Sequence, residues 1–336
     1  MSMLFSLCFA LIVANYLFTK SLISYAHKKQ LLDIANHRSS HTQATPRIGG
    51  LSFTILISVI IFGYASFHHQ HNNASLLFFI LLPIVIVALT GLLDDIKGLK
   101  RSTRFLVYFA CSVIALGNLS TLFEQSYGII LIEGLLLSLG LSWFINLFNF
   151  MDGIDGIAAS EAIFILVALA FFCFQGGDAT TGHLLLICTA PVLGFLLLNW
   201  QPAKIFMGDI GSTFLGCLIG CLFFYLINTK LLNIYSAIIL SGCFVVDATW
   251  TLAYRILSGQ KWYQAHRSHH YQILSRKISS HQQVTSLYTL VNLVWLFPLA
   301  LLAYHAKEYA LLITTISLLP LLARCFIIGA GKPECN

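Results

Sequence analysis

Charged residues are scarce in this chain of 336 residues, and their scarcity excludes an ordinary soluble domain. Asp, Glu, Lys and Arg make up 10% of the sequence, whereas roughly a quarter of the residues in a soluble globular domain are charged. Hydrophobic residues account for 58%. This composition indicates a protein whose chain crosses a membrane several times.

Three further absences narrow the class of protein. The nine cysteines include no Cys-x-x-Cys pair, so we interpret them as small apolar packing residues. There is no basic patch with interleaved aromatic residues, which argues against nucleic acid as a partner. No Lys or Arg precedes the first apolar stretch, and Lys20, Lys28 and Lys29 follow it, so we expect a retained first helix rather than a cleaved signal peptide.

Long apolar runs, in contrast, are abundant. One membrane-spanning helix needs about 20 mostly apolar residues. On this criterion we expect an all-α polytopic membrane protein with about eleven transmembrane helices, forming a single integral membrane domain over 1–336. The expected spans are 4–24, 49–67, 76–93, 104–118, 129–147, 158–174, 182–198, 207–227, 232–254, 286–304 and 308–328.

Lys and Arg are distributed unequally between the two sides of such a topology. With the N-terminus outside, the connections 25–48, 94–103, 148–157, 199–206 and 255–285 and the C-terminal tail are cytoplasmic. They hold most of the basic residues, whereas the outer connections hold only Lys230 and Lys307. Because cytoplasmic loops are enriched in Lys and Arg, we predict that the N-terminus is outside and the C-terminus is cytoplasmic. The net charge of +6 then faces anionic lipid or phosphate.

Each cytoplasmic connection carries a polar motif, and the outer connections carry none. The motifs are TPRIGG (45–50), GLLDDIKGLKRSTR (91–104), NLFNFMDGIDG (146–156), NWQPAKIFMGDIGS (199–212) and AHRSHHYQIL (265–274). A random scatter would rarely give this arrangement. We therefore expect one composite site, built from the cytoplasmic loops 25–48, 94–103, 148–157, 199–212 and 255–285.

The side chains in these motifs indicate phosphate chemistry. They comprise the carboxylates Asp94, Asp95, Asp152, Asp155 and Asp209, the amides Asn146, Asn149 and Asn199, and the cationic candidates Arg47, Lys97, Lys204, His266, Arg267, His269 and His270. Clustered oxygen ligands suit a hard ion such as Mg²⁺, with Mn²⁺ as the alternative. Nearby cations suit anionic phosphates. Together they predict phosphoryl transfer at the membrane surface, with a lipid as one substrate.

Structural interpretations compete with these functional ones. Asp94 and Asp95 at the end of an apolar run also suit a hydrophilic stop, MGDIGS suits a turn at a helix end, and the histidine-rich segment suits a solvated loop. DGIDG is more specific, because two carboxylates near a bilayer are costly unless they are used or paired. Asp247 is either a structural partner of Arg255 or a site residue, and the sequence does not separate these two roles.

In this order and at these separations, TPRIGG, GLLDDIKGL, NLFNFMDGIDG, PAKIFMGDIGS and HRSHHYQ resemble the polyprenyl-phosphate N-acetylhexosamine-1-phosphate transferase family, of glycosyltransferase 4 type. The resemblance covers about 230 residues, 45–274, and every cytoplasmic loop. It implies an eleven-helix enzyme of the bacterial cytoplasmic (inner) membrane, with its active site facing the cytoplasm. Its substrates would be a UDP-N-acetylhexosamine and undecaprenyl phosphate, in contact with membrane lipid, and UMP would be released. Whether the chain forms a homodimer is left open.

Within the family the motifs favour one branch. The phospho-N-acetylmuramoyl-pentapeptide transferases, the alternative function, typically have ten spans and a TPTMGG-like sequence in place of TPRIGG. The branch that starts enterobacterial common antigen has a compact His-x-His-His, whereas this chain has a wider HRSHH. HRSHHYQ is more similar to transferases that initiate O antigen. The resemblance therefore implies O-antigen initiation in lipopolysaccharide synthesis, and it does not identify the sugar.

The resemblance also implies residue roles. Asp209 resembles the family's Mg²⁺ ligand, and Asn149 resembles a second ligand. Asp94 and Asp95 match an aspartate pair implicated in catalysis or in the surroundings of the lipid phosphate. The other matched residues are Asp152 and Asp155, with catalytic roles at the nucleotide and metal site, and Arg47, Lys97, Asn199, Lys204, His266, Arg267, His269 and His270, with substrate-binding roles.

Two questions of mechanism and class stay open at this point. A lipid phosphate is mostly dianionic at pH 7 and hardly needs a general base, so we expect direct attack on the sugar-bearing phosphorus. A covalent aspartyl-phosphate route is the alternative. A transporter or lipid flippase is the alternative of another class, although carboxylates in transporters tend to lie near the bilayer midplane rather than at one interface.

Overall fold

The computed structural model describes residues 2–33, 44–67, 77–119, 127–261, 263–264 and 266–333, and most of these are helical. The longer helices are α1 (Ser2–Lys29), α2 (Gly50–Phe67), α4 (Leu82–Lys97), α5 (Arg101–Ala115), α6 (Tyr127–Met151), α7 (Ile157–Gln175), α8 (Ala179–Asn199), α9 (Gly208–Asn228), α11 (Gly242–Leu257), α13 (His281–Val291) and α15 (Ala310–Ile328). Shorter helical elements are η1 (Leu77–Leu81), η2 (Leu116–Asn118), α10 (Ile234–Leu240), α12 (His270–Ile278), η4 (Asn292–Leu296), α14 (Phe297–His305) and η5 (Lys307–Tyr309).

Nine helical segments in the described ranges are long and apolar enough to cross a membrane. They are Met3–Lys29, Gly50–Phe67, Leu77–Lys97, Ile130–Met151, Ile157–Gln175, Ala179–Asn199, Gly208–Asn228, His281–His305 and Lys307–Ile328. α10 and α11 form a further candidate, bent by 78° at their junction. α5, with 15 residues, is shorter than the others. The prediction of an all-α polytopic membrane protein is confirmed, whereas eleven crossings stay a prediction.

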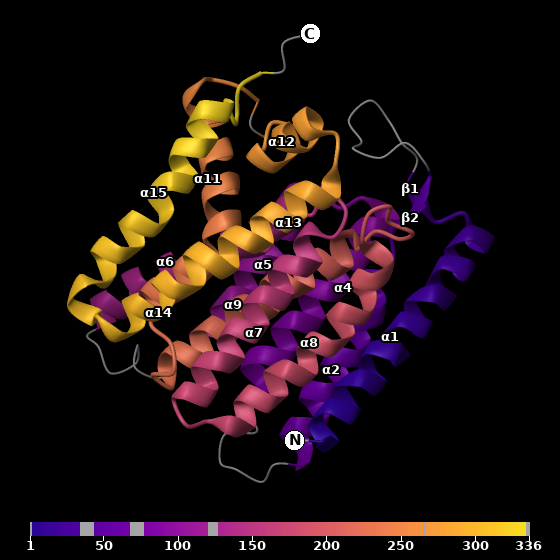
Figure 1. Ribbon diagram of the computed structural model, residues 1–336, viewed down its shortest axis with the longest axis horizontal. Helices are drawn as coiled ribbons and strands as arrows, with labels where there is room; N and C mark the ends of the chain where they lie inside the picture. The colour runs from indigo at the N-terminus through magenta and orange to yellow at the C-terminus, as the bar shows by residue number, and fades with distance from the viewer. Residues whose placement is uncertain are drawn as a thin grey trace.

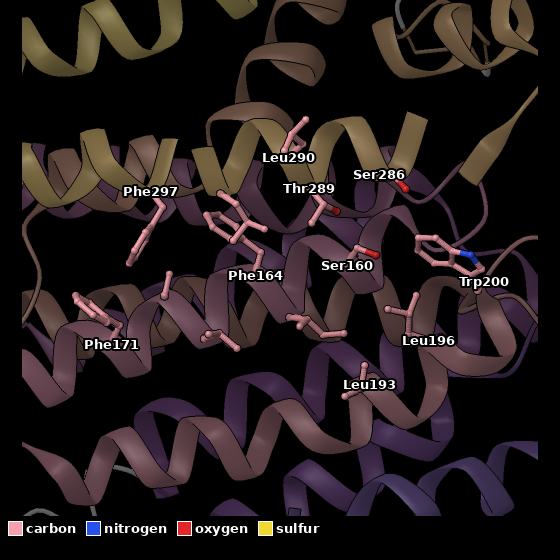
Figure 2. A pocket seen from close by; sticks show the side chains of 14 residues that line it. Ser160, Phe164, Phe171, Leu193, Leu196, Trp200, Ser286, Thr289, Leu290 and Phe297 are labelled. Atoms are coloured by element: carbon pink, nitrogen blue, oxygen red, sulfur yellow. The ribbon is translucent and has the colours of Figure 1, made fainter. Parts of the chain in front are cut away.

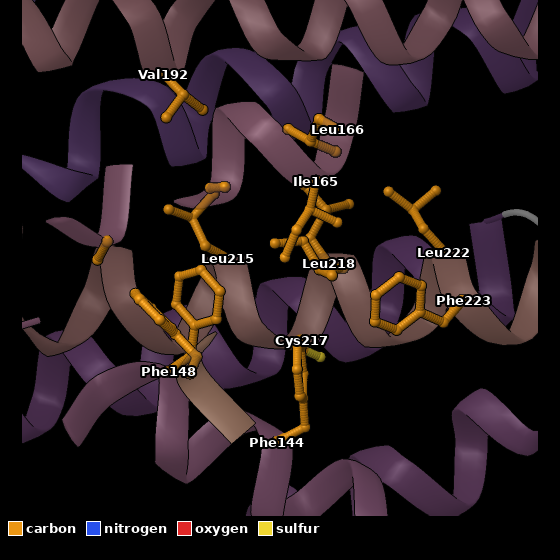
Figure 3. Close-up of a cluster of buried hydrophobic side chains, with 14 of the residues drawn as sticks. Phe144, Phe148, Ile165, Leu166, Val192, Leu215, Cys217, Leu218, Leu222 and Phe223 are labelled. Atoms are coloured by element: carbon orange, nitrogen blue, oxygen red, sulfur yellow. The ribbon is translucent and has the colours of Figure 1, made fainter. Parts of the chain in front are cut away.

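α9 lies in the middle of the helical bundle, packed against α2, α4 and α6 (Figure 1). Small residues permit its close packing against α6: a Cβ atom added to Gly216 would lie 2.9 Å from the Cβ of Phe148. Phe144 and Phe148 of α6 and Leu218 of α9 belong to one buried apolar cluster (Figure 3). The first turn of α9, which carries Asp209, is therefore held at the centre of one end of the bundle.

The polar motifs gather at that end, which we call the site end: α4, α6 and α8 finish there, and α9 and α13 begin there. A two-stranded antiparallel pair, β1 (Leu32–Asp33) and β2 (Thr45–Pro46), lies at the site end between α1 and α2. Its register pairs Leu32 with Pro46 and Asp33 with Thr45. Figure 1 shows this pair and α12 at the site end, and the start of α1 at the opposite end. Residues 34–43 of the first predicted loop lie outside the described ranges.

Candidate active site

Asp95 joins three of the motifs. Its side chain, 1% exposed, accepts hydrogen bonds from the backbone N–H groups of Asp209 (Oδ1, 3.1 Å) and Ile210 (Oδ2, 3.1 Å). Arg47 Nη2 donates to Asp95 Oδ1 at 2.6 Å. The carboxylate thus satisfies N–H groups in the first turn of α9, which have no partner within the helix. Because it is occupied in this way, Asp95 fixes the position of α9 relative to α4.

Gly208 makes this junction compact. Its φ of +72° lies in the left-handed region that favours glycine, and an added Cβ atom would lie 2.1 Å from the carbonyl oxygen of Arg47. The backbones also pair directly, since Phe206 N donates to Pro46 O at 2.7 Å and Gly50 N donates to Met207 O at 2.8 Å. TPRIGG and the MGD motif are therefore one structural unit.

Asp94 faces a different set of groups. Its Oδ1 atom accepts a hydrogen bond from the backbone N–H of Leu99 at 2.6 Å, and its Oδ2 atom forms a short ion pair with Arg104 Nη1. The same Arg104 nitrogen lies 3.4 Å from Asp209 Oδ2. Arg104 was not among the residues singled out from the sequence. Arg104 is the last residue of GLKRSTR, but only the fold reveals that it bridges the carboxylates of Asp94 and Asp209.

Asn149 and Asp209, the two predicted metal ligands, are in contact. Asn149 Nδ2 donates to Asp209 Oδ1 and to Ser212 Oγ, both at 2.9 Å. α6 continues unbroken to Met151, so Asn146 faces its own helix and donates to the carbonyl of Ser142 instead. The structure thus brings Asn149, but not Asn146, to the first turn of α9.

Asp152 stands apart from the other carboxylates. It is half-buried, and no described residue forms a hydrogen bond with its side chain. Burial, followed by the negative charges of Asp209, Asp95 and Asp155, raises the pKa of Asp152 well above its usual range. A cation placed among these carboxylates would relieve that repulsion.

Asp155 and Asn199 hold the surrounding loops together. Asp155 Oδ2 accepts a hydrogen bond from Ala203 N at 3.0 Å, and its Oδ1 atom lies 3.2 Å from Nδ1 of His281. Asn199 accepts a hydrogen bond from Gly156 N at 3.1 Å and donates one to a backbone carbonyl six residues later. His281, at the start of α13, was missed in the sequence because it lies outside the five motifs.

Asp247 contacts the histidine-rich segment and holds it in place. Asp247 accepts hydrogen bonds from the backbone N–H groups of His270 (2.8 Å) and Tyr271 (3.0 Å), at the start of α12. Tyr271 in turn donates its hydroxyl to the carbonyl of Phe150 at 2.9 Å. Asp247 therefore positions the histidine-rich segment against the end of α6, and within the described residues Arg255 is not its partner.

Two histidines of this segment, His266 and His269, stack on each other, and none of His266, His269 and His270 is exposed. The ring centroids of His266 and His269 are 5.0 Å apart, and His269 Nδ1 lies 3.4 Å from Asp247 Oδ1. Burial lowers the pKa of His266 to about 3 and also lowers that of His270. A lowered pKa favours the neutral ring in both histidines, which can then serve as hydrogen-bonding groups. Arg267 supplies a fixed positive charge.

Lys97 and Lys204, predicted to bind substrate, are both exposed at the site end. Among the described residues, no three His, Cys, Asp or Glu side chains are arranged around a single metal position. Mg²⁺ usually takes one or two carboxylates and completes its shell with water and substrate phosphates. Asp209, Asp152 and Asn149 are the candidate oxygen donors for such an ion.

Comparisons with known proteins identify the family. The model of a family described as glycosyl transferase family 4 matches residues 77–227. A probable undecaprenyl-phosphate N-acetylglucosaminyl 1-phosphate transferase of Bacillus subtilis (strain 168) is 30% identical over 270 residues, covering 76% of this chain and 73% of the relative. A phospho-N-acetylmuramoyl-pentapeptide-transferase of Streptococcus pneumoniae serotype 19F (strain G54) is 27% identical over 262 residues, covering 71% of this chain and 76% of the relative. The chain therefore belongs to the polyprenyl-phosphate N-acetylhexosamine-1-phosphate transferase family.

Proposed function

We propose that this protein transfers a sugar-1-phosphate from a UDP-N-acetylhexosamine to undecaprenyl phosphate, giving the undecaprenyl-diphosphate sugar and UMP. The observation that carries the proposal is the meeting of polar groups from five separate connections at one end of an apolar bundle. A site at the end of membrane helices suits a reaction between a lipid and a water-soluble donor. The names of the two relatives support the same reaction class.

Mg²⁺, with Mn²⁺ as the alternative, is the proposed cofactor. Asp209, Asn149 and Asp152 would hold it, and the donor diphosphate would supply further oxygens. The ion would neutralise charge on the phosphate oxygens. Two tests follow: Mg²⁺ should raise the thermal midpoint of the purified protein, and Asp209→Asn should abolish UMP release with little loss of folded protein.

The chain's own residues account for the other steps of the proposed reaction. Arg104 and Arg267 would draw the two anionic substrates together and offset their mutual repulsion. An oxygen of the lipid phosphate then forms a bond to the sugar-bearing phosphorus. The bond from that phosphorus to the bridging oxygen breaks, and UMP leaves with the electron pair.

A covalent route would instead place the phospho-sugar on an aspartate before the lipid enters. Asp94 and Asp152 are the candidates, because Asp95 and Asp155 are occupied by backbone N–H groups. We propose that Asp95, Asp155 and Asn199 act by positioning the loops. Recovery of a labelled phospho-sugar on the protein without lipid would contradict direct attack.

The geometry of the site also supports eleven crossings. Asp94 lies at the end of α4 and Asn149 at the end of α6, yet Asn149 contacts Asp209 directly and Asp94 is joined to it through Arg104. The chain between them must therefore cross the membrane an even number of times, which requires α5 as well as α6. We propose eleven crossings, with the N-terminus outside and the site in the cytoplasm, where Lys and Arg are concentrated.

The decisive experiment is UMP release from UDP-sugars by membranes that contain the protein, undecaprenyl phosphate and Mg²⁺. A transporter or flippase would release none. UDP-N-acetylglucosamine and its epimers test the proposed role in initiating O antigen at the bacterial inner membrane. The nucleotide-linked muramoyl pentapeptide tests the alternative, which the second relative favours.

A further inference from the structure

A buried acid lies outside the proposed site, in the second turn of α7. Glu161 is 2% exposed, within a segment long and apolar enough to span a membrane. Asn292, 1% exposed, is the first residue of η4, directly after α13. Asn292 Nδ2 donates a hydrogen bond to Glu161 Oε2 at 2.5 Å. Neither residue belongs to any of the five motifs.

If Glu161 is ionised, this pair has more hydrogen-bond acceptors than donors to fill them. Glu161 Oε1 and Asn292 Oδ1 both lack a hydrogen-bond partner in the described structure. Both atoms are then acceptors without a donor, in a place where unpaired polar atoms are costly. Turning the amide over does not help, because it would put Asn292 Oδ1 at 2.5 Å from Glu161 Oε2. Two oxygens approach so closely only through a proton.

An ionised Glu161 would also lack a positively charged partner. Within the described part of the chain, no Lys, Arg or His side chain forms an ion pair with Glu161. An unpaired carboxylate in a membrane span is strongly disfavoured. A proton removes the charge and at the same time turns one acceptor oxygen into a donor.

We infer that Glu161 is held as a neutral carboxylic acid, paired with the Asn292 carboxamide by two hydrogen bonds, and that this pair positions α13 against α7. One bond runs from the Asn292 amide to the acid, and the other from the acid O–H to the amide oxygen. Both side chains are planar, and along the shared edge each offers a donor and an acceptor, so Glu161 Oε1 and Asn292 Oδ1 gain the partner that they otherwise lack.

The position of α13 matters for the site, and this part of the inference rests on the proposed function. Thr285 Oγ1 donates to the backbone carbonyl of Asp155 at 2.9 Å, and His281 lies against the Asp155 carboxylate. α7 starts directly after the same loop. Fixing α13 to α7 therefore holds the DGIDG loop from both sides. Glu161 and Asn292 are positioning residues in this scheme.

An apolar groove of about 660 Å³ lies between α7, α8, α13 and α14, lined by residues next to the pair in sequence, such as Ser160 and Leu293. Figure 2 shows Ser160 and Phe164 of α7 facing Thr289 and Leu290 of α13 across it. Ser160 directly precedes Glu161, so a shift at the pair would change the groove as well.

Infrared difference spectroscopy of the purified protein tests the protonation state. The spectrum of wild type minus Glu161→Gln should contain the C=O stretch of a carboxylic acid at neutral pH. Glu133→Gln, which changes an exposed glutamate on α6, is the matched control. The spectrum of Glu133→Gln should still contain the carboxylic acid band of Glu161. A carboxylate band in the Glu161 difference spectrum would overturn the inference.

Two variants test the pairing. Glu161→Gln keeps one donor and one acceptor, so it should retain the thermal midpoint and the UMP release of the wild type. Glu161→Met has similar size but no donor, so it should lower both, with UMP release falling at least threefold. Equal loss in the two variants would overturn the role of the hydrogen bonds. Because spectra and thermal midpoints need no substrate, failure of the proposed transferase activity would be recognised separately.

Discussion

Asp95 and Asp152 carry the same functional group in opposite surroundings. Asp95 accepts two backbone hydrogen bonds and an ion pair with Arg47. Asp152 has no such partner in the described structure and is surrounded by other carboxylates. Stability and activity should therefore respond differently when each is replaced by the neutral amide.

Asp152→Asn should lower the rate of UMP release by about 100-fold or more, as expected when a group that handles transition-state charge is lost. Its thermal midpoint without Mg²⁺ should be unchanged or higher. The reason is the sign of the pKa shift: a raised pKa means that the ionised carboxylate destabilises the folded state at pH 7. Thermal unfolding in detergent and the UMP assay measure the two effects.

Asp95→Asn is the comparison for that experiment. Asparagine has one acceptor oxygen, so it retains at most one of the two backbone bonds and loses the ion pair. Leaving a buried N–H unsatisfied costs roughly 1–3 kcal/mol, so the midpoint should fall along with activity. A midpoint that falls for Asp152→Asn and not for Asp95→Asn would contradict these assignments.

Arg104→Ala should reduce UMP release by about 100-fold, because it removes the cation that lies between Asp94 and Asp209. Arg104→Lys should recover part of the rate, since lysine keeps the charge but not the forked geometry. Arg101→Ala is the matched control: Arg101 is exposed and lies over the ring of Tyr263, 5.7 Å from its centroid. Equal rates for Arg101→Ala and Arg104→Ala would remove Arg104 from the site.

At the residue scale, the sequence predicted which motifs would meet but not what each side chain would contact. Asn149 and Asp209 are in contact, whereas their role as metal ligands stays a prediction. Arg104 was missed because a basic residue at the start of a predicted span is common and has no distinguishing pattern, and His281 was missed because it lies outside the five motifs. Their importance comes from partners far away in the sequence, such as Asp209 for Arg104 and Asp155 for His281.

At the scale of elements, two helices begin at a carboxylate supplied by another segment. Asp95 serves α9 and Asp247 serves α12, each through two successive backbone N–H groups. Sequence-based capping rules look for the acceptor immediately before the helix, so neither case could be predicted. The break between α10 and α11 could not be predicted either, because the sequence shows one apolar run, 232–254, which was expected to be a single span.

Gly153→Ala tests how α12 is attached to the end of α6. A Cβ atom at Gly153 would lie 2.1 Å from the hydroxyl oxygen of Tyr271, which donates to the carbonyl of Phe150. Breaking this contact should displace the histidine-rich segment and raise the KM for the UDP-sugar by about tenfold, the effect of losing roughly 1.4 kcal/mol of binding.

Gly140→Ala is the control for that variant. Gly140 lies on α6 with nothing within 4 Å of an added Cβ atom, so its KM should stay at the wild-type value. Helix propensity should make Gly140→Ala slightly more stable. An unchanged KM in Gly153→Ala would show that the Tyr271 contact does not position the residues that we propose to bind the nucleotide.

For the whole molecule, the bilayer makes the helices easy to predict from sequence and the loops hard. Spans must be long and apolar, so each expected span coincides with a helix, an interrupted helix or a helix pair. Loops obey no such rule. The β1–β2 pair, the short α12 and the placement of Arg47 against Asp95 depend on contacts between distant segments.

The number of crossings depends on α5. Its 15 residues and the three of η2 extend about 28 Å at the usual rise per residue, close to the roughly 30 Å of bilayer hydrocarbon. If α5 crosses, the chain has eleven crossings and its two ends lie on opposite sides. If α5 lies within one leaflet and the other spans cross, the ends lie on the same side, and Asp94 and Asn149 would face opposite compartments.

Epitope tags at the two ends separate these topologies. In spheroplasts treated with an external protease, the N-terminal tag should be cleaved and the C-terminal tag protected. In permeabilised spheroplasts, both tags should be cleaved, which controls for tags that are folded away. Protection or cleavage of both tags in intact spheroplasts would contradict eleven crossings. The expected result would also place the site, which is assembled from the ends of α4, α6 and α8, in the same compartment as the C-terminus. The reason is that α13–α14 and α15 make two crossings, which return the chain to the side on which α13 begins.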